Sequence, residues 1–397
     1  MEVKPGYKQT EVGVIPDDWE VSTFGDVFNV TAGGDVDPKR SKSYQDEIHC
    51  YPIYSNALTN YGLYGYCSYA DHPADTITIT ARGMVGSANF RDHPYTAIGR
   101  VLVLQPKSDM AGRYFADVIN SRVKFANEST GVPQLTAPQI STYRLPVPPL
   151  PEQRAIAGAL SDVDALLGVL EQLIAKKRDL KQAAMQQLLT GQTRLPGFHG
   201  EWAVKRLGDF GVFLKGFGIK KDEVVSDGLP CIRYGEIYTH HNDHLKAFNS
   251  FIKPATAKQS QRIVQGDLLF AGSGETVEEI GKCVAFLGDE EAYAGGDIVI
   301  FGPVGQDSKF LGFLMNHSNV TRQKARMGQG DAVVHISARN LAQLELHLPT
   351  LPEQIAIAEI LSDMDAELAA LTQRRDKTCA LKQGMMQELL TGRIRLV

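Results

Sequence analysis

The sequence predicts an α+β protein in which two similar mixed α/β domains are separated by two long antiparallel coiled-coil helices. Three observations support this prediction. A long segment occurs twice in the chain, both copies have the periodicity of a helix, and the two blocks outside the copies share their ends but not their middles. We therefore expect domain 1 at 1–148, a helix at 149–195, domain 2 at 196–349 and a second helix at 350–397.

The repeated segment begins with Leu-Pro-Glu-Gln at Leu150 and at Leu351, and it ends at Leu195 and Leu396. The two copies align without a gap and are identical at well over half of their positions. A period of roughly 200 residues is too long for a stacked solenoid repeat. It indicates the duplication of a unit that contains one domain and one helix.

Both copies carry residues typical of helix ends. A proline stands where the first helical turn tolerates it, the next glutamate complements the positive end of the helix dipole, and a glycine follows the last turn. These residues are Pro151, Glu152 and Gly191 in the first copy and Pro352, Glu353 and Gly392 in the second.

Apolar residues recur along each copy at alternating steps of four and three, as in a coiled-coil seam. They are Ile156, Leu160, Val163, Leu167, Leu170 and Ile174 in the first copy and Ile357, Leu361, Met364, Leu368 and Leu371 in the second. Two helices of equal phase favour antiparallel pairing, which gives the two halves pseudo-two-fold symmetry. Each helix would be roughly 60 Å long. The alternative, in which each helix packs on its own domain, stays open.

The two blocks outside the helices are diverged copies of one frame. Related segments begin at Trp19 and Trp202, and both tryptophans are expected in the cores. Alternating or apolar runs that end in glycine or proline predict strands, and two further segments each predict an amphipathic helix followed by a basic stretch. The strands are expected within 75–83, 99–106, 266–274 and 295–303, and the helices within 114–130 and 310–328.

Composition excludes several classes of protein. The chain has 397 residues, enough for two or three globular domains, and we expect neither a transmembrane helix nor a signal peptide. Five scattered cysteines without a CxxC pair predict free thiols and no zinc site. The net charge of −5 argues mildly against a chain that binds nucleic acid without partners, because phosphate neutralisation needs a basic surface.

The sequence lacks the motifs of nucleotide-binding loops, adenine methyltransferases and metal-dependent nucleases. It has no GxxxxGK[ST] loop, no Asn-Pro-Pro-aromatic segment and no nuclease-type acidic pair followed by E-x-K. His240, His241, Asp243 and His244 have metal-ligand chemistry, but adjacent histidines do not easily face one ion, so we expect a solvated loop. We therefore expect no catalytic residue and no metal site.

The pattern LPEQ…LSDxDA…LKQ…MQxLLTG, present twice, resembles the conserved regions of the specificity subunits of type I restriction-modification enzymes. The resemblance covers nearly the whole chain and includes PCIRYGEIY, GDLLFAGSGE and the two tryptophan openings. It implies two target-recognition domains, each of which recognises one half of a bipartite DNA target. It also implies that the helices fix the spacing and dock the methyltransferase subunits.

The resemblance further implies partners and cofactors. The expected partners are double-stranded DNA, two methyltransferase (modification) subunits and two restriction (translocase-nuclease) subunits, with no membrane. The partner subunits would use S-adenosylmethionine, ATP and Mg²⁺, and this chain would bind no cofactor. The complex would be an adenine-N6 methyltransferase and an ATP-dependent endonuclease in the cytoplasm.

Residues that contact base edges should be polar or basic and should lie on loops. We selected candidates that border strand ends or lie in basic stretches at corresponding places in the two domains. They are Tyr54, Ser55, Asn56, Arg82 and Gln134 in domain 1, and Arg233, Tyr234, Ser273, Arg322, Lys324, Arg326, Gln329 and His335 in domain 2. A solvated or structural role remains the alternative for each of them.

Other functions remain open at this point. The chain could be the recognition subunit of another bipartite-target restriction class, a self-contained DNA-modifying enzyme with an unfamiliar site, or a coiled-coil adaptor that never meets DNA. Turnover by the purified chain with DNA and S-adenosylmethionine or Mg²⁺ would indicate the enzyme. Salt-dependent DNA binding together with the methyltransferase would exclude the adaptor.

Overall fold

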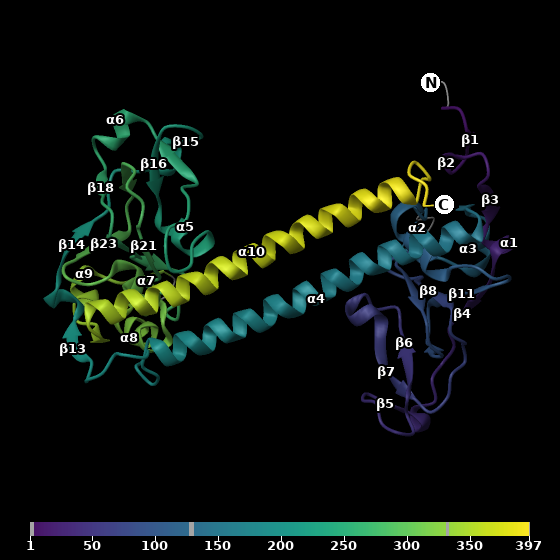
Figure 1. Ribbon diagram of the computed structural model, residues 1–397, viewed down its shortest axis with the longest axis horizontal. Helices are drawn as coiled ribbons and strands as arrows, with labels where there is room; N and C mark the ends of the chain where they lie inside the picture. Colours follow the sequence, from purple (N-terminus) through teal and green to yellow (C-terminus); the bar gives the residue numbers. More distant parts are fainter. Residues whose placement is uncertain (1–3, 127–130, 331–332, 397) are drawn as a thin grey trace. The chain divides into compact units, whose positions relative to one another are not determined.

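The computed structural model describes residues 4–126, 131–330 and 333–396. The chain divides into two compact units, Met1–Glu171 with Gln373–Val397 (unit 1) and Gln172–Thr372 (unit 2). Each unit contains one mixed α/β domain and parts of both long helices, so the borders of the units fall inside the helices (Figure 1).

Domain 1 is built on two four-stranded sheets and two strand pairs. The first sheet is antiparallel and has the order β4-β11-β8-β9; in the second, β10-β6-β7-β5, only the β10–β6 pair is parallel. The strands are β1 (Tyr7–Thr10), β2 (Gly13–Pro16), β3 (Glu20–Thr23), β4 (Phe28–Ala32), β5 (Ser41–Lys42), β6 (Tyr51–Tyr54), β7 (Leu63–Cys67), β8 (Thr76–Thr80), β9 (Ala88–Arg91), β10 (Thr96–Ala97), β11 (Val101–Pro106) and β12 (Arg144–Val147). The helices are α1 (Phe24–Val27), α2 (Gly112–Arg122) and α3 (Ala137–Ser141), with 3-10 turns at Pro38–Arg40 and Thr59–Gly62.

Domain 2 repeats the frame of domain 1. Its antiparallel sheet β14-β23-β19-β21 corresponds to β4-β11-β8-β9, and its pair β13–β25 corresponds to β3–β12. The strands are β13 (Ala203–Arg206), β14 (Gly211–Lys215), β15 (Val224–Val225), β16 (Leu229–Ile232), β17 (Ser250–Ile252), β18 (Gln261–Ile263), β19 (Leu268–Ala271), β20 (Ser273–Gly274), β21 (Cys283–Ala285), β22 (Ala292–Ala294), β23 (Ile298–Pro303), β24 (Val334–His335) and β25 (Glu345–Leu348). The helices are α5 (Tyr234–Thr239), α6 (Pro254–Ala257), α7 (Ser308–Asn316), α8 (Ser318–Met327) and α9 (Ala338–Leu341), with 3-10 turns at Leu207–Asp209 and Lys221–Glu223.

The sequence patterns explain the central strands. β8 has the sequence TITIT and is buried on both faces, because α2 covers it on one side. The segment 310–328, predicted as one helix followed by a basic stretch, forms two helices, α7 and α8, and the basic residues are helical. His317 has extended backbone dihedrals and accepts a hydrogen bond from the amide of Asn319, so it ends α7 and caps α8. Residues 127–130, the end of the first predicted helical segment, lie outside the described residues.

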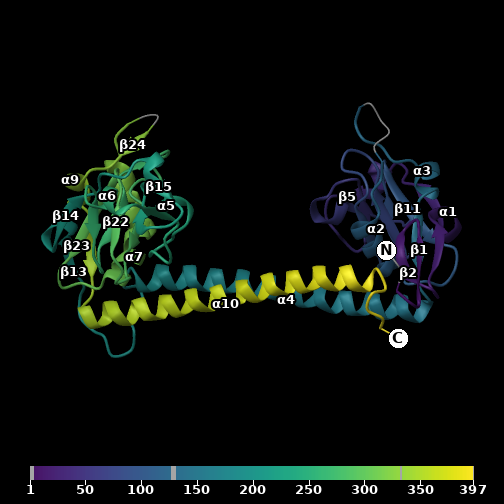
Figure 2. The same cartoon turned by 90° about the horizontal axis from the view of Figure 1, so that it is seen from above.

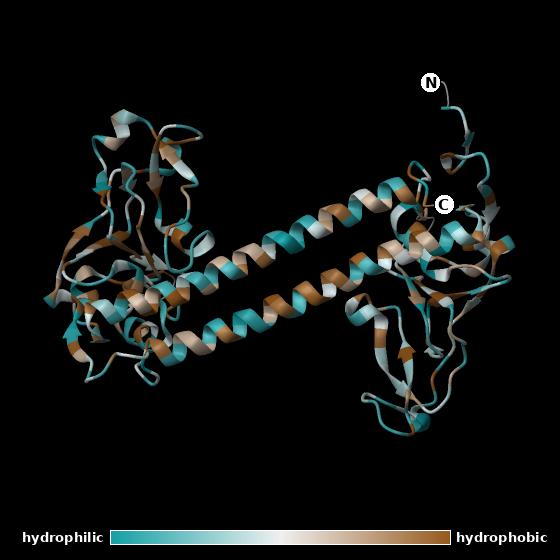
Figure 3. Ribbon diagram, in the orientation of Figure 1, coloured by the Kyte–Doolittle hydropathy of each residue, from teal (hydrophilic) through white to brown (hydrophobic). Residues whose placement is uncertain are grey.

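The two long helices are α4 (Leu150–Leu188) and α10 (Leu351–Leu389). Within each unit they run antiparallel and share one kind of ion pair. In unit 1, Lys382 of α10 lies 2.6 Å from Asp164 of α4; in unit 2, Lys181 of α4 lies 2.7 Å from Asp365 of α10. Hydrophobic and hydrophilic residues are interspersed along both helices (Figure 3). The predicted pairing and the predicted fold class are confirmed.

The ends of both helices also belong to the domain cores. The alternative prediction, in which each helix packs on its own domain, is therefore partly right as well. Ile156 and Leu160 at the start of α4 pack in the core of domain 1, together with Leu389 and Leu390 from the end of α10. Unit 2 repeats this exchange, with the start of α10 and the end of α4 in the core of domain 2. Each domain core is thus completed by both helices, which bury apolar area that neither helix could bury alone.

A buried carboxylate joins the start of α4 to the chain that follows α10. Glu152 is fully buried and accepts hydrogen bonds from the Nε (2.5 Å) and Nη2 (2.8 Å) of Arg395. It also accepts one from the indole Nε1 of Trp19 at 2.8 Å, and Arg395 in turn contacts Asp18. The predicted core position of Trp19 is confirmed.

Unit 2 contains the equivalent clamp. Fully buried Glu353 at the start of α10 accepts hydrogen bonds from the Nε (2.6 Å) and Nη2 (2.7 Å) of Arg194, which follows α4. The guanidinium lies 5.8 Å from the ring centre of Trp202, which is half-buried, and the indole nitrogen of Trp202 has no hydrogen-bond partner among the described residues. We call these two groups the Glu–Arg clamps.

The neighbouring glutamine anchors each helix to its domain. The side-chain amide of Gln153 donates to the carbonyl of Pro148 at 2.8 Å, and its carbonyl accepts from the amide of Ala111 at 3.1 Å. Gln354 makes the same two kinds of bond in unit 2. The repeated Pro-Glu-Gln motif therefore combines a helix start, a clamp and an anchor.

The glycine after each helix is required by its backbone and by its surroundings. Gly191 and Gly392 have φ values of 71° and 68°, a region that favours glycine. A Cβ at Gly392 would lie 2.5 Å from Pro16 and 3.1 Å from Trp19. The glycine thus lets the chain turn against the core before the clamp arginine.

One predicted DNA-contacting residue lies in the core. Lys324 is only 1% exposed, and its ammonium group donates to the carbonyl of Gly281 at 2.6 Å. Burial lowers the pKa of Lys324 to about 8. Lys324 was predicted to contact DNA because it lies between Arg322 and Arg326 in a basic stretch. Its buried position does not suit such a contact, because α8 directs this side chain into the core.

Replacing Arg395 by alanine should destabilise unit 1 by about 3 kcal/mol, because the buried carboxylate of Glu152 would lose its counter-charge. Urea unfolding of the full chain measures this loss. As a matched control, Arg154→Ala breaks the exposed pair of Arg154 and Asp109 and should have a much smaller effect. Equal losses in the two variants would contradict the importance of the clamp.

The pKa of Lys324 predicts a pH dependence of stability. Between about pH 8 and pH 10.5 the unfolded chain holds a proton on this lysine that the folded chain has released, so Lys324 should raise the free energy of unfolding by about 3 kcal/mol across this range. The buried thiols of Cys231 and Cys283, whose pKa values are raised, act in the opposite direction in every variant. The measurement is therefore the difference between the wild type and Lys324→Met in urea unfolding, which should grow by that amount over this range. An exposed control, Lys176→Met, should follow the wild type, and a constant difference between the wild type and Lys324→Met would refute the assignment.

Candidate nucleic-acid interface

Both domains have an equivalent edge where the central strand ends, next to one turn and one later segment. In domain 1 the loop edge consists of residues 81–83, 100 and 133–135. The amide of Ala81 donates to the carbonyl of Arg100 at 3.2 Å, and the amide of Leu135 donates to Ala81 at 2.8 Å. Arg82 and Gln134 face each other as a β-bridge.

In domain 2 the loop edge consists of residues 272–274, 297 and 334–336. The amide of Gly272 donates to the carbonyl of Asp297 at 2.7 Å, and the amide of Ile336 donates to Gly272 at 2.9 Å. Ser273 and His335 face each other in the β20–β24 pair. The bonds are the same as in domain 1, but the side chains differ. In unit 2, β24 lies on the side of the domain away from the long helices (Figure 2).

Three candidates of domain 1, Tyr54, Ser55 and Asn56, are engaged within the domain, and Asn56 supports the loop edge. The Nδ2 of Asn56 donates to the carbonyl of Arg82 at 2.5 Å, and its Oδ1 accepts from the amide of Ala81 at 2.6 Å. Its amide group is therefore engaged with the backbone that positions Arg82. Ser55 donates to the carbonyl of Gly62.

Tyr54 is buried and is engaged by two neighbouring side chains. The guanidinium of Arg91 lies 3.4 Å from the centre of its ring, and its hydroxyl lies 2.8 Å from the Nε2 of His93. Burial raises the pKa of Tyr54. A side chain so engaged does not suit direct contact with a base, whereas Arg82 and Gln134 are exposed on the loop edge.

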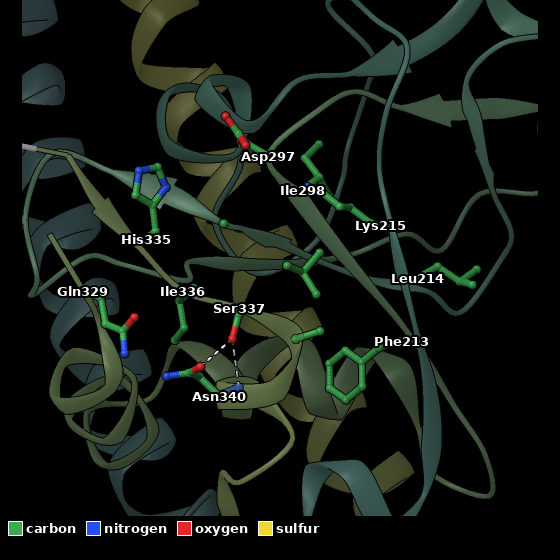
Figure 4. Close-up of a pocket in the computed structure, with 13 residues that line it drawn as sticks. Phe213, Leu214, Lys215, Asp297, Ile298, Gln329, His335, Ile336, Ser337 and Asn340 are labelled. Atoms are coloured by element: carbon green, nitrogen blue, oxygen red, sulfur yellow. Dashed lines mark hydrogen bonds between the residues drawn. The ribbon is translucent and has the colours of Figure 1, made fainter.

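The loop edge of domain 2 borders a cavity of about 420 Å³ (Figure 4). His335 is exposed and its Nδ1 lies 2.9 Å from the Oγ of Ser273, which is itself buried. Gln329 is exposed and pairs through its backbone with His335. Lys215 at the end of β14 and Asp297 also line the cavity.

A second cavity, of about 630 Å³, shares Asp297 with the first. Arg233 and Tyr234 line it at the start of α5, with Lys221 and His240. The Nε of Arg233 is buried and has no hydrogen-bond partner among the described residues, while its Nη2 lies 3.4 Å from Glu236. Tyr234 is 40% exposed. The structure thus brings these two candidates together around one hollow.

Arg322 and Arg326 are exposed on α8. The guanidinium of Arg322 donates to the side chain of Asn319 at 2.6 Å, so it is held along the surface of the helix. Arg326 lies near the end of α8, three residues before Gln329 in the chain. Of the candidates in domain 2, Lys324 and Ser273 are buried and the others are at least partly exposed.

Sequence reasoning missed Arg100, Asp297 and Lys215, which belong to or border the loop edges. A signal for the first two existed in the sequence. Each follows a glycine and precedes the apolar run of the equivalent strand, in GRVLVL and GGDIVIF. Both residues were included only in the expected strands 99–106 and 295–303.

Other features of the described residues bear on function. No group of three or more His, Cys, Asp or Glu residues among them is placed to hold a metal ion. The residues at 240–244 do not share one metal site. Asp243 is buried, lies 3.6 Å from Lys181 and bonds to Asn316, and burial raises its pKa.

All five cysteines are free. Within the described part of the chain, no helix combines the length and apolar character needed to cross a bilayer.

Comparisons with known proteins agree with this architecture. The family model described as type I restriction modification DNA specificity domain matches residues 16–176 and 199–378. The type I restriction enzyme MjaVIII specificity subunit of Methanocaldococcus jannaschii is 23% identical over 71% of this chain and 69% of its own length. A putative type I restriction enzyme MjaX specificity subunit of the same organism is 22% identical over 98% of this chain and 97% of its own length.

Solved structures share the fold. The S subunit of a type I restriction-modification system from M. genitalium has a TM-score of 0.65 at 13% identity and covers 98% of both chains. A chain from a structural study of complex assembly and conformational transition of the type I R-M system has a TM-score of 0.52 at 14% identity, over 96% of this chain and 99% of its own. Since the family model matches most of the sequence in two segments, the chain belongs to the family of type I restriction modification DNA specificity domains and carries two of them.

Proposed function

We propose that the two recognition domains of this type I specificity subunit each recognise one half of a bipartite double-stranded DNA target, and that the chain itself performs no catalysis. The observation that supports this most directly is the pair of loop edges. Their backbones make the same hydrogen bonds, whereas their side chains differ: Arg82 and Gln134 in domain 1, Ser273 and His335 in domain 2. One frame with two different sets of donors and acceptors suits two different half-sites.

The proposal gives the long helices a role in spacing and assembly. Each helix has 39 residues, which corresponds to roughly 58 Å at 1.5 Å per residue. Half-sites on one face of a duplex lie about 34–36 Å apart, or a multiple of this distance. The helices would set the separation of the two recognised sequences and would provide docking surfaces for two methyltransferase subunits.

The chemistry would lie in the partner subunits. Two methyltransferase subunits would transfer a methyl group from S-adenosylmethionine to the N6 of an adenine, and two restriction subunits would use ATP and Mg²⁺ to translocate and cleave DNA. The complex would act in the cytoplasm. The net charge of −5 agrees with this division, because much of the phosphate neutralisation would come from the partners.

Exchanging domain 1 (residues 1–148) for that of a relative with a different target should replace one half of the methylated sequence and leave the other half unchanged. The reason is that the base-contacting side chains belong to each domain separately. Sequencing of methylated adenines in DNA from cells with the chimaera and its methyltransferase measures the outcome. The reciprocal exchange of residues 196–349 should replace the other half.

Three outcomes distinguish this proposal from the alternative functions. A chimaera with an unchanged methylated sequence would contradict the proposal and favour an adaptor. Methyl transfer by the purified chain alone would favour a self-contained enzyme. Cleavage at a fixed distance from the target, without ATP, would indicate another bipartite-target restriction class.

Inserting three seven-residue seam repeats into both α4 and α10 should lengthen the spacer and leave both half-sites unchanged. The insertion preserves the phase of the seam and adds roughly 32 Å, close to one turn of the duplex, so both half-sites stay on one face. Mapping of the methylated sequences measures the spacer. An insertion in α4 alone serves as the control and should abolish methylation, because the two helices would no longer match in length; an unchanged spacer in the double insertion would exclude the role in spacing.

A further inference from the structure

Two charged residues occupy the same unusual backbone conformation in the two domains. Arg100 immediately precedes β11 and has a φ of 69°; Asp297 immediately precedes β23 and has a φ of 60°. This left-handed region is disfavoured for side chains with a Cβ and is normally taken by glycine. Each residue follows a glycine in the chain, so the strained position itself holds the larger residue.

The fold fixes the backbone of both residues but does not use their side chains. Their carbonyls accept the hydrogen bonds from Ala81 and Gly272 that hold the loop edges together. Both side chains are exposed, and neither makes a hydrogen bond or an ion pair with any residue that the structure describes. A glycine could make the same backbone bonds without strain, and a larger residue kept in a strained conformation is typical of sites of binding or catalysis.

The position of Asp297 adds a second observation. It lines both the cavity of about 420 Å³ beside His335 and the cavity of about 630 Å³ beside Arg233. Asp297 is therefore shared by the cavities of both groups of candidate residues in domain 2, and Figure 4 shows it with His335 and Gln329 around the first cavity. Arg100 has the equivalent place beside Arg82 on the loop edge of domain 1.

The two side chains have opposite chemistry. An arginine offers a fork of donors that matches the O6 and N7 acceptors of guanine in the major groove, whereas an aspartate accepts from the N4 amino group of cytosine. Neither group could replace the other at the same base. The same structural position should therefore select a different base in each half-site.

We propose that Arg100 and Asp297 are specificity-determining residues: Arg100 contacts a guanine in one half-site, and Asp297 accepts a hydrogen bond from the amino group of a cytosine in the other. This inference rests on the proposed function, in which the domains recognise DNA. It adds two residues that the sequence patterns did not select and states which base chemistry each one recognises.

A third residue of the same kind supplies a matched control. Asp75 has a φ of 61°, is exposed, and precedes β8 at the opposite end of that strand from the loop edge. Asparagine tolerates the left-handed region, so Arg100→Asn, Asp297→Asn and Asp75→Asn all change the charge without adding strain. Thermal unfolding of each full chain verifies that it is folded.

The test uses each variant chain in complex with its methyltransferase subunits, with double-stranded DNA from a randomised target library. Sequencing of the methylated molecules gives the preference at every position of both half-sites. Arg100→Asn should weaken the preference for guanine at one position of one half-site by roughly 10-fold to 100-fold, and Asp297→Asn should do the same for cytosine at one position of the other. Asp75→Asn should leave both half-sites unchanged.

Several results would overturn the inference. They are an unchanged sequence preference in Arg100→Asn and Asp297→Asn, a uniform loss of methylation at all sequences, a change in the same half-site for both variants, or an unfolded variant. A uniform loss would assign the residues to phosphate contacts or to assembly. If the wild-type complex methylated no bipartite sequence, the proposed function itself would fail, and the two failures are therefore distinguishable.

Discussion

The fold depends on two carboxylates that are removed from water at the starts of the long helices. Glu152 and Glu353 are fully buried, and a buried carboxylate is tolerated only with a counter-charge and hydrogen bonds. The counter-charge never comes from the same helix. Arg395, which follows α10, neutralises Glu152, and Arg194, which follows α4, neutralises Glu353. Each unit is therefore more stable when the start of one helix meets the end of the other, and this favours the antiparallel arrangement within the unit.

The clamps also explain why the two domains can diverge in their middles without losing the fold. Leucines from the ends of both helices complete the core of each domain, and the glutamine beside each clamp glutamate bonds to the domain backbone. The residues that specify the architecture are thus concentrated in the repeated segment and in the strand pairs β3–β12 and β13–β25. The loop edges lie on other segments, so their side chains can change while the clamps, anchors and central sheets remain.

The sequence predicted the helices, the duplication, the central strands and the core position of Trp19, because periodicity and end signals are local properties of the chain. It predicted the candidate site less well. Asn56 belongs to a loop that looks suited to base contact, but its amide is engaged with the backbone of Ala81 and Arg82. Lys324 stands in a basic stretch, but α8 and its packing bury it. Arg100 and Asp297 were missed because a glycine before each strand marks a turn, but the sequence does not show that the residue after this glycine has the positive φ.

The acidic net charge becomes understandable when affinity and specificity are considered separately. Contacts with phosphates supply most of the affinity for DNA and require a basic surface, whereas contacts with base edges select the sequence and can use acidic, neutral or basic groups. The loop edge of domain 2 presents an aspartate and a histidine, which contribute little to phosphate binding. In the proposed function, this chain therefore contributes more to sequence specificity than to affinity for DNA. With affinity and the catalytic sites both in the partner subunits, as proposed, recognition and catalysis would operate only in the assembled complex.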